Sequence, residues 1–134
     1  MQFRGYQGLT VWNRAVDLVE RTYRLTDTLR SEAAPEILAD MRRAALSIPS
    51  HLAAGYQTSS TLEYLRHVHA AQLTLGKLET RTTILERLKW AEADDLGELQ
   101  SLLSHVNQLL HCLERYLTGQ RDDVELEDRS PSSN

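Results

Sequence analysis

Cysteine, phenylalanine, proline and glycine are scarce in this chain of 134 residues, which contains 1, 1, 3 and 6 of them. The single cysteine, Cys112, excludes an internal disulfide. It lies in an apolar-rich segment, so we expect a small core or interface residue there rather than a nucleophile. Few prolines and glycines leave few points for turns, and this favours long helices over many short strands.

Long apolar runs are also missing from the sequence. No stretch is long enough to span a bilayer. The first residues, MQFRGYQG, lack the charged region and apolar run of a signal peptide. We therefore expect a cytoplasmic protein without a membrane partner.

The net charge of −4 is unevenly spread. Residues 1–119 contain 13 basic and 14 acidic residues, whereas residues 120–134 contain 2 basic and 5 acidic ones. A nearly neutral body is not typical of a general nucleic-acid binder. The acidic last segment has few core-forming residues, so we expect it to be disordered.

Sequence motifs for catalysis or metal binding are missing as well. There is no glycine-rich phosphate loop and no HExxH. Di-iron bundles pair a Glu with a His three residues later, but Glu63 precedes His67 by four. No Arg precedes a His by the four to six residues used by a helical ribonuclease class of similar architecture. A hydrolase triad needs no such proximity, but nothing selects one. We expect no enzyme, no cofactor and no metal.

Apolar residues that recur every three or four positions predict four helices. The first should run from about Thr10, a plausible cap, to Arg30, and the second should begin at Pro35, where the missing donor costs nothing. The third is expected from Thr61 to about Trp90 and should be the longest. Ser60 and Glu63 match a capping box at its start. The fourth should begin after an Asp cap at residue 94 or 95 and end at Gly119.

The second helix has the most distinctive sequence, MRRAALSIPSHLAAGY, over residues 41–56. Its apolar arc is wide enough to need several neighbours. Pro49 removes one backbone donor inside the helix at a cost of about 3 kcal/mol, so we expect a kink, with Ser47 and Ser50 bonding the freed groups. Gly55 is well placed to end the helix in a left-handed conformation.

The fourth helix has two apolar stripes. Its main seam alternates steps of three and four and includes Leu103, Val106 and Leu110, which we expect to be buried together with Trp12, Tyr23 and Ile48. A second stripe repeats every seven residues beside that seam. A single bundle contact does not require it, so we interpret it as a subunit interface formed by Leu102, Leu109 and Tyr116.

Five arginines are candidates for binding a nucleic acid or a partner. Arg14, Arg21 and Arg24 follow one helical line, but Asp17, Glu20 and Asp27 interleave with it. The line is therefore either a solvated mixed-charge face or a surface that faces RNA or a partner. Arg42 and Arg43 are either solvated, with Asp40 as a weak partner for Arg43, or one of them lies between subunits.

Several short motifs together resemble a known family. They are Phe3-Arg4, Val11-Trp12, Arg42-Arg43-Ala44, Ser47-Ile48-Pro49, and Leu78-Glu79-Thr80. The resemblance spans roughly residues 3–118 and is to the four-helix bundle proteins associated with 23S ribosomal RNA intervening sequences. That family also includes the accessory protein of diversity-generating retroelements. The chain departs from the family pattern at His51, Ala54 and Lys77, where Asn, Glu and Glu are usual.

The resemblance implies a ring of five subunits, and one branch of the family works with a reverse transcriptase and its RNA. Together with the periodicity, it predicts an all-α, antiparallel up-down-up-down bundle in residues 1–119, followed by an acidic disordered tail in residues 120–134. We expect a non-catalytic homo-oligomer, as a pentameric ring, that acts as a scaffold for RNA or a nucleic-acid-processing partner. The alternative is a purely protein-binding or structural module with no nucleic-acid role.

Overall fold

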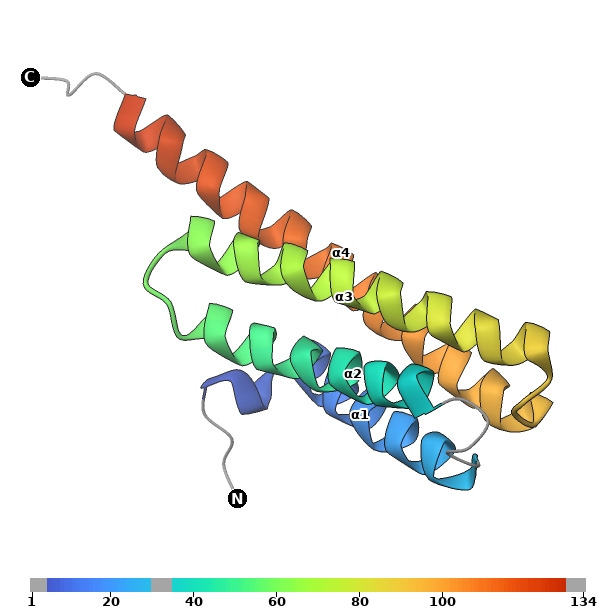
Figure 1. Ribbon diagram of the computed structural model, residues 1–134. Coiled ribbons are helices and arrows are strands. Elements are labelled where there is room, and N and C mark those ends of the chain that lie inside the picture. Colours follow the sequence, from blue (N-terminus) through green and yellow to red (C-terminus); the bar gives the residue numbers. More distant parts are fainter. Residues whose placement is uncertain (1–4, 30–34, 130–134) are drawn as a thin grey trace, which may run out of the picture.

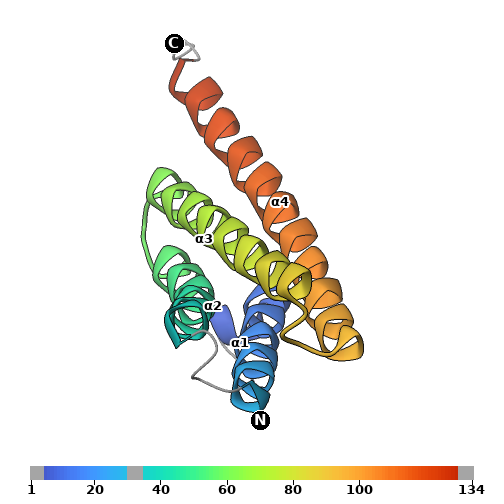
Figure 2. The ribbon, with the colours of Figure 1, turned by 45° about the vertical axis from the view of Figure 1, so that its right-hand side comes forward.

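The computed structural model describes residues 5–29 and 35–129, with side chains up to residue 123. A short 3-10 turn, η1 (Gly5–Gly8), precedes four helices: α1 (Thr10–Thr28), α2 (Pro35–Tyr56), α3 (Thr61–Leu88) and α4 (Ala93–Arg129). Successive helices run in opposite directions (Figure 1), and α4 returns to pack against α1 as well as α3. The turned view in Figure 2 shows the four helices around a common core. The predicted antiparallel four-helix bundle is confirmed.

The core consists of the apolar faces of all four helices. Ile48, Leu103, Val106 and Leu110 are buried, as predicted. On α1, however, the buried stripe is the one beside the expected pair, and it consists of Val11, Ala15, Leu18, Thr22 and Leu25. Trp12 and Tyr23 are only half-buried, so the prediction of a largely buried pair is wrong.

A threonine occupies the middle of the α1 core stripe, which explains why the apolar pattern pointed to the neighbouring face. Thr22 is fully buried, and its hydroxyl donates to the Leu18 carbonyl at 2.8 Å. The hydroxyl therefore costs little to bury, because a buried polar group is tolerated once it is hydrogen-bonded. Trp12 instead lies at the rim, with its ring centroid 5.3 Å from that of Tyr6 in η1.

Helix α2 continues through Pro49 to Tyr56. The proline leaves the Ala45 carbonyl without its usual helical donor. The two serines do not bond that carbonyl, contrary to our expectation: Ser47 donates to the Ala44 carbonyl at 3.2 Å and Ser50 to the Leu46 carbonyl at 2.9 Å. They thus bond the carbonyls on either side of the freed one. A kink at Pro49 stays a prediction.

Gly55 does not end α2 in a left-handed conformation, so that prediction is wrong. Within the described residues only Gly5 and Lys89 have a positive φ. Gly55 is buried, and a Cβ built on it would lie 2.8 Å from Cδ1 of Tyr64 and 3.0 Å from Cβ of His67. The position therefore needs glycine because α3 passes very close to it, and not because of a turn.

Helix α3 begins as predicted, with Ser60 as its cap. The Ser60 hydroxyl accepts from the Glu63 backbone N–H at 3.2 Å. The Glu63 carboxylate does not complete the capping box; it pairs instead with Arg66 on the next turn. The helix ends at Leu88, two residues earlier than expected, because Lys89 adopts the left-handed conformation with φ 57°.

Helix α4, rather than α3, is the longest, with 37 residues against 28. It starts at Ala93, so Asp94 and Asp95 lie in its first turn, where acidic side chains favour the positive end of the helix dipole. It does not stop at Gly119 but continues to Arg129, and its last turns project beyond the first turn of α3 (Figure 1).

The predicted stop at residue 119 and the start of a disordered tail at residue 120 are therefore misplaced. An exposed glycine costs a helix only about 1 kcal/mol, and the good helix formers Gln120 and Arg121 follow it directly. Residues 130–134 lie outside the described part, as do Phe3 and Arg4. None of the helices in the described part combines the length and the apolar content that a transmembrane span requires.

Candidate functional site

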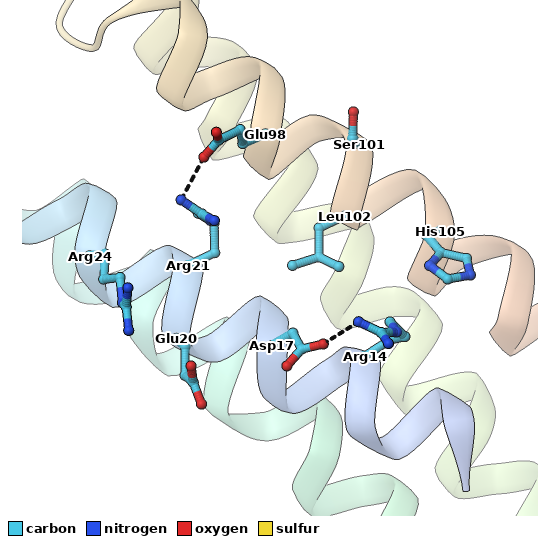
Figure 3. A pocket seen from close by; sticks show the side chains of 9 residues that line it. All are labelled: Arg14, Asp17, Glu20, Arg21, Arg24, Glu98, Ser101, Leu102 and His105. Atoms are coloured by element: carbon cyan, nitrogen blue, oxygen red, sulfur yellow. Dashed lines mark hydrogen bonds and ion pairs between the residues drawn. The ribbon is translucent and has the colours of Figure 1, made fainter.

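The first candidate site is a groove of about 460 Å³ between α1 and α4 (Figure 3). Three of the five candidate arginines lie here, because residues 14, 21 and 24 recur at helical spacing on the outer side of α1. Helix α4 contributes the opposite wall. The lining residues are Arg14, Asp17, Glu20, Arg21, Arg24, Glu98, Ser101, Leu102 and His105.

Carboxylates neutralise most of the positive charge in this α1–α4 groove. Arg14 pairs with Asp17 one turn along α1 at 2.5 Å, and Arg21 pairs with Glu98 across the groove at 2.6 Å (Figure 3). Arg24 has no ion-pair partner in the part of the chain that the structure describes. Arg21 therefore ties α1 to α4, and the line as a whole has the mixed charge of a solvated face.

Arg42 connects α2 to α1 through three contacts. Its Nε donates to the Thr26 hydroxyl at 2.7 Å, and its Nη2 pairs with Asp27 at 2.5 Å. The guanidinium carbon also lies 4.7 Å from the centroid of the Tyr23 ring, which is a cation–π geometry. These contacts fix Arg42 in an intrachain role that sequence reasoning did not foresee.

The groove beside Arg42, between α1 and α2, has a more apolar lining and a volume of about 630 Å³. Tyr23 and Leu29 come from the end of α1, while Leu38 and Leu46 come from α2. Leu46 is 46% exposed although it is a large apolar residue. This α1–α2 groove therefore offers a surface that another apolar element could cover.

Arg43 also lines the α1–α2 groove, and it borders a second groove of about 240 Å³ between α2 and α3. It pairs with Asp40 at 2.5 Å, as one of the two sequence interpretations had it, and Arg81 of α3 approaches the same carboxylate at 3.5 Å. The hydrogen bond from Arg43 lowers the pKa of Asp40 below its ordinary value, and the positive charge of Arg81 adds to this effect.

Lys77 of α3 also lines this α2–α3 groove, together with Ser47 and Thr74. Sequence analysis missed Lys77 and Arg81 as site residues. They stand four apart on α3, which places them on one face, but only the antiparallel register of α2 and α3 brings them to Asp40 and Arg43. An antiparallel alignment of the two helices on a helical net would have placed these four residues together.

Two histidines meet near Gly55, where α3 passes close to α2. The Nδ1 atoms of His51 and His67 are 3.1 Å apart, so one ring donates and the other accepts. Burial lowers the pKa of His51, and the charge of His67 lowers it further. Burial also raises the pKa of the neighbouring Tyr64.

A second group of titratable side chains joins α3 to α4. His69 Nε2 lies 2.7 Å from Glu114 Oε2, and His111 Nδ1 lies 3.7 Å from the other oxygen of that carboxylate. Among the described residues, no three His, Cys, Asp or Glu side chains are placed to hold a metal ion. Cys112 is exposed, so it is not a core residue, and the other expected position, at a subunit interface, stays a prediction.

The predicted interface residues of α4 differ in exposure. Leu102 and Leu109 are partly buried against the core of their own chain. Tyr116 is 62% exposed, and its hydroxyl accepts from Nε2 of Gln120 at 2.7 Å. Tyr116 is therefore the member of the stripe whose apolar surface remains largely uncovered.

Comparison with known proteins places these features in a family. The profile described as "23S rRNA-intervening sequence protein" matches residues 7–112, which include α1, α2, α3 and the first half of α4. A search of curated proteins gave no match. The family match covers well over half of the chain and includes the Arg42-Arg43-Ala44 and Ser47-Ile48-Pro49 motifs. The chain therefore belongs to the family of 23S rRNA-intervening sequence proteins.

Proposed function

We propose that this protein is a non-catalytic scaffold that assembles into a closed ring of identical subunits and presents RNA or a nucleic-acid-processing partner on that ring. Five subunits is the number that the family resemblance implies. The observation that carries the proposal is the amount of apolar side-chain surface left outside the core of one chain.

The uncovered apolar residues are large and lie on several helices. Leu73 is 72% exposed, Tyr116 62% and Leu46 46%. Soluble monomers rarely leave contiguous apolar patches larger than a few hundred Å² uncovered. Further large apolar side chains with substantial exposure are Tyr56, Leu62, Ile84, Leu88 and Trp90.

A ring of more than two subunits requires two different surfaces on each subunit, because each subunit contacts its two neighbours through unlike surfaces. We assign one surface to the α4 stripe that ends at Tyr116. We assign the other to the apolar α1–α2 groove beside Leu46. Their charges are complementary: Arg43 borders the groove, whereas Asp122 and Asp123 follow Tyr116 on α4.

Ion pairs in the grooves described above favour a structural role for these surfaces. Arg14, Arg21 and Arg43 are engaged with carboxylates. Such pairs hold surfaces in place.

The alternative is a protein-binding module with no nucleic-acid role, and one observation favours it. Four of the five arginines proposed to face RNA already have a carboxylate partner in their own chain, so their positive charge is largely neutralised. RNA binding that weakens as salt is raised would separate the scaffold from this alternative.

Light scattering after size-exclusion chromatography tests the assembly directly. We expect the unmodified protein to elute as a single closed oligomer at micromolar concentration. Tyr116→Glu should release monomers that keep their helical circular dichroism, because Tyr116 contributes little to the core. Gln108→Glu places the same charge on an exposed polar position of α4 and should leave the oligomer intact. An unmodified protein that is monomeric would refute the ring.

A further inference from the structure

The α2–α3 groove gathers more positive charge than its single carboxylate balances. Arg43 from α2 and Lys77 and Arg81 from α3 line it, and Asp40 is the acidic residue among its lining residues. Three cations and one carboxylate leave a formal charge of about +2 in a volume of about 240 Å³. The chain as a whole has a net charge of −4, so the positive charge of this groove is opposite in sign to that of the chain.

The comparison with the α1–α4 groove makes the difference clear. There, three arginines face three carboxylates, from Asp17, Glu20 and Glu98, and the formal charges cancel. In the α2–α3 groove, by contrast, Arg43 and Arg81 share one carboxylate. Lys77 has no ion-pair partner in the described part of the chain. Its ammonium is one of the two uncompensated charges, and the other comes from the two arginines that share Asp40.

The donors of the groove are suited to oxygen atoms of an anion. A guanidinium has five N–H donors and an ammonium has three. Arg81 uses one nitrogen on the Lys77 carbonyl at 3.1 Å and another on Asp40 at 3.5 Å, so it retains further N–H groups. The hydroxyls of Ser47 and Thr74 already donate to backbone carbonyls. Binding would therefore depend on the cations.

Backbone geometry holds these cations close together. The antiparallel register pairs the Asp40 turn of α2 with the Arg81 turn of α3, and the approach at Gly55 fixes the same two helices farther along. An anion entering the groove would find its partners already gathered, which reduces the entropy that binding costs. A phosphate with a charge between −1 and −2 would offset the excess charge of the site.

We propose that the α2–α3 groove is a phosphate-binding site formed by Arg43, Lys77 and Arg81. The phosphate comes either from the backbone of RNA or from free inorganic phosphate. The RNA source rests on the scaffold function proposed above, whereas the phosphate site does not.

The test uses the full chain and two probes, a fluorescently labelled single-stranded oligouridine and inorganic phosphate. Lys77→Glu reverses one of the uncompensated charges at an exposed position. The matched control is Arg87→Glu, which makes the same charge reversal at an exposed position of α3 outside the groove. We expect Lys77→Glu to raise the Kd for the oligouridine by about tenfold at low salt. The slope of log K against log salt should become less steep by about 0.7 for each phosphate contact that is lost. The control should stay within about twofold of the unmodified protein.

Each result decides a different part of the proposal. Unmodified protein that binds oligouridine, with no effect of Lys77→Glu, would overturn the site while leaving the RNA scaffold standing. If oligouridine does not bind but phosphate raises the Tm of the unmodified protein and not of Lys77→Glu, the site holds and its ligand is free phosphate. Failure of both probes, or stronger binding of polyglutamate than of oligouridine, would overturn the phosphate site. Light scattering of each variant reports the ring separately.

Discussion

Replacement of Gly55 by alanine is expected to destabilise the protein, whereas the same replacement at Gly76 is expected to stabilise it. Both glycines lie inside helices, so alanine should favour the helix by about 1 kcal/mol at either position. Gly76 is exposed, and a Cβ there would meet no atom within 4 Å. Only the helix-propensity term therefore applies, and Gly76→Ala should gain about 0.5–1 kcal/mol.

At Gly55 a steric cost opposes that gain. The new Cβ would lie 2.8 Å from the Tyr64 ring and 3.0 Å from Cβ of His67. The ring can rotate a little, but the His67 Cβ is fixed to the α3 backbone, so α3 has to move. Overpacking of this kind costs about 1–3 kcal/mol. After subtraction of the propensity gain, we expect a net loss of up to about 2 kcal/mol.

Urea unfolding followed by circular dichroism measures both variants. With a slope of about 1–3 kcal/mol per molar urea, the Gly55→Ala loss should lower the midpoint by up to about one molar, and Gly76→Ala should raise it by a few tenths of a molar. If Gly55→Ala raised the midpoint as much as Gly76→Ala does, the close approach of α2 and α3 at this position would be refuted. Loss of stability in Gly76→Ala would mean that α3 packs against another surface there.

Three further predictions concern stability. The lowered pKa of His51 means that the unfolded state takes up a proton that the folded state resists, so stability should fall as the pH drops below 6.5. His51→Gln should flatten this fall in urea unfolding at a series of pH values, and an unchanged slope would contradict the histidine pair. Leu110→Ala should cost about 2–5 kcal/mol, because Leu110 is fully buried; a loss below about 1 kcal/mol would mean that α4 packs differently. Ser60→Ala should cost about 1 kcal/mol through loss of the α3 cap, and thermal unfolding with no change in Tm would refute that role.

Helix number, order and most helix starts follow from the sequence because they depend on local interactions. The Ser60 cap and the position of Pro35 act within a single turn of backbone. The seam of α4, with Leu103, Val106 and Leu110, has a period that a helix alone can satisfy. Helix ends were less predictable, since Gly119 is compatible with both a stop and a continuing helix, and only the energy difference between them decides.

The candidate site depended much more on tertiary structure. Arg42 and Arg43 are neighbours in the sequence, yet one faces Asp27 of α1 and the other lines a groove with Lys77 of α3. Successive residues on a helix point about 100° apart, so their surroundings are set by different neighbouring helices. No local pattern contains that information.

Gly55 shows within a single residue what the sequence determines and what depends on the tertiary structure. The presence of glycine inside a helix indicated that the backbone needed glycine at this position, and the sequence determined this much by itself. A helix can need glycine either for a left-handed turn or for the close passage of another segment, and on the sequence alone we considered only the turn. The structure decided for close passage, because the distance between α2 and α3 depends on how all four helices fill one core, and this packing is a property of the whole chain.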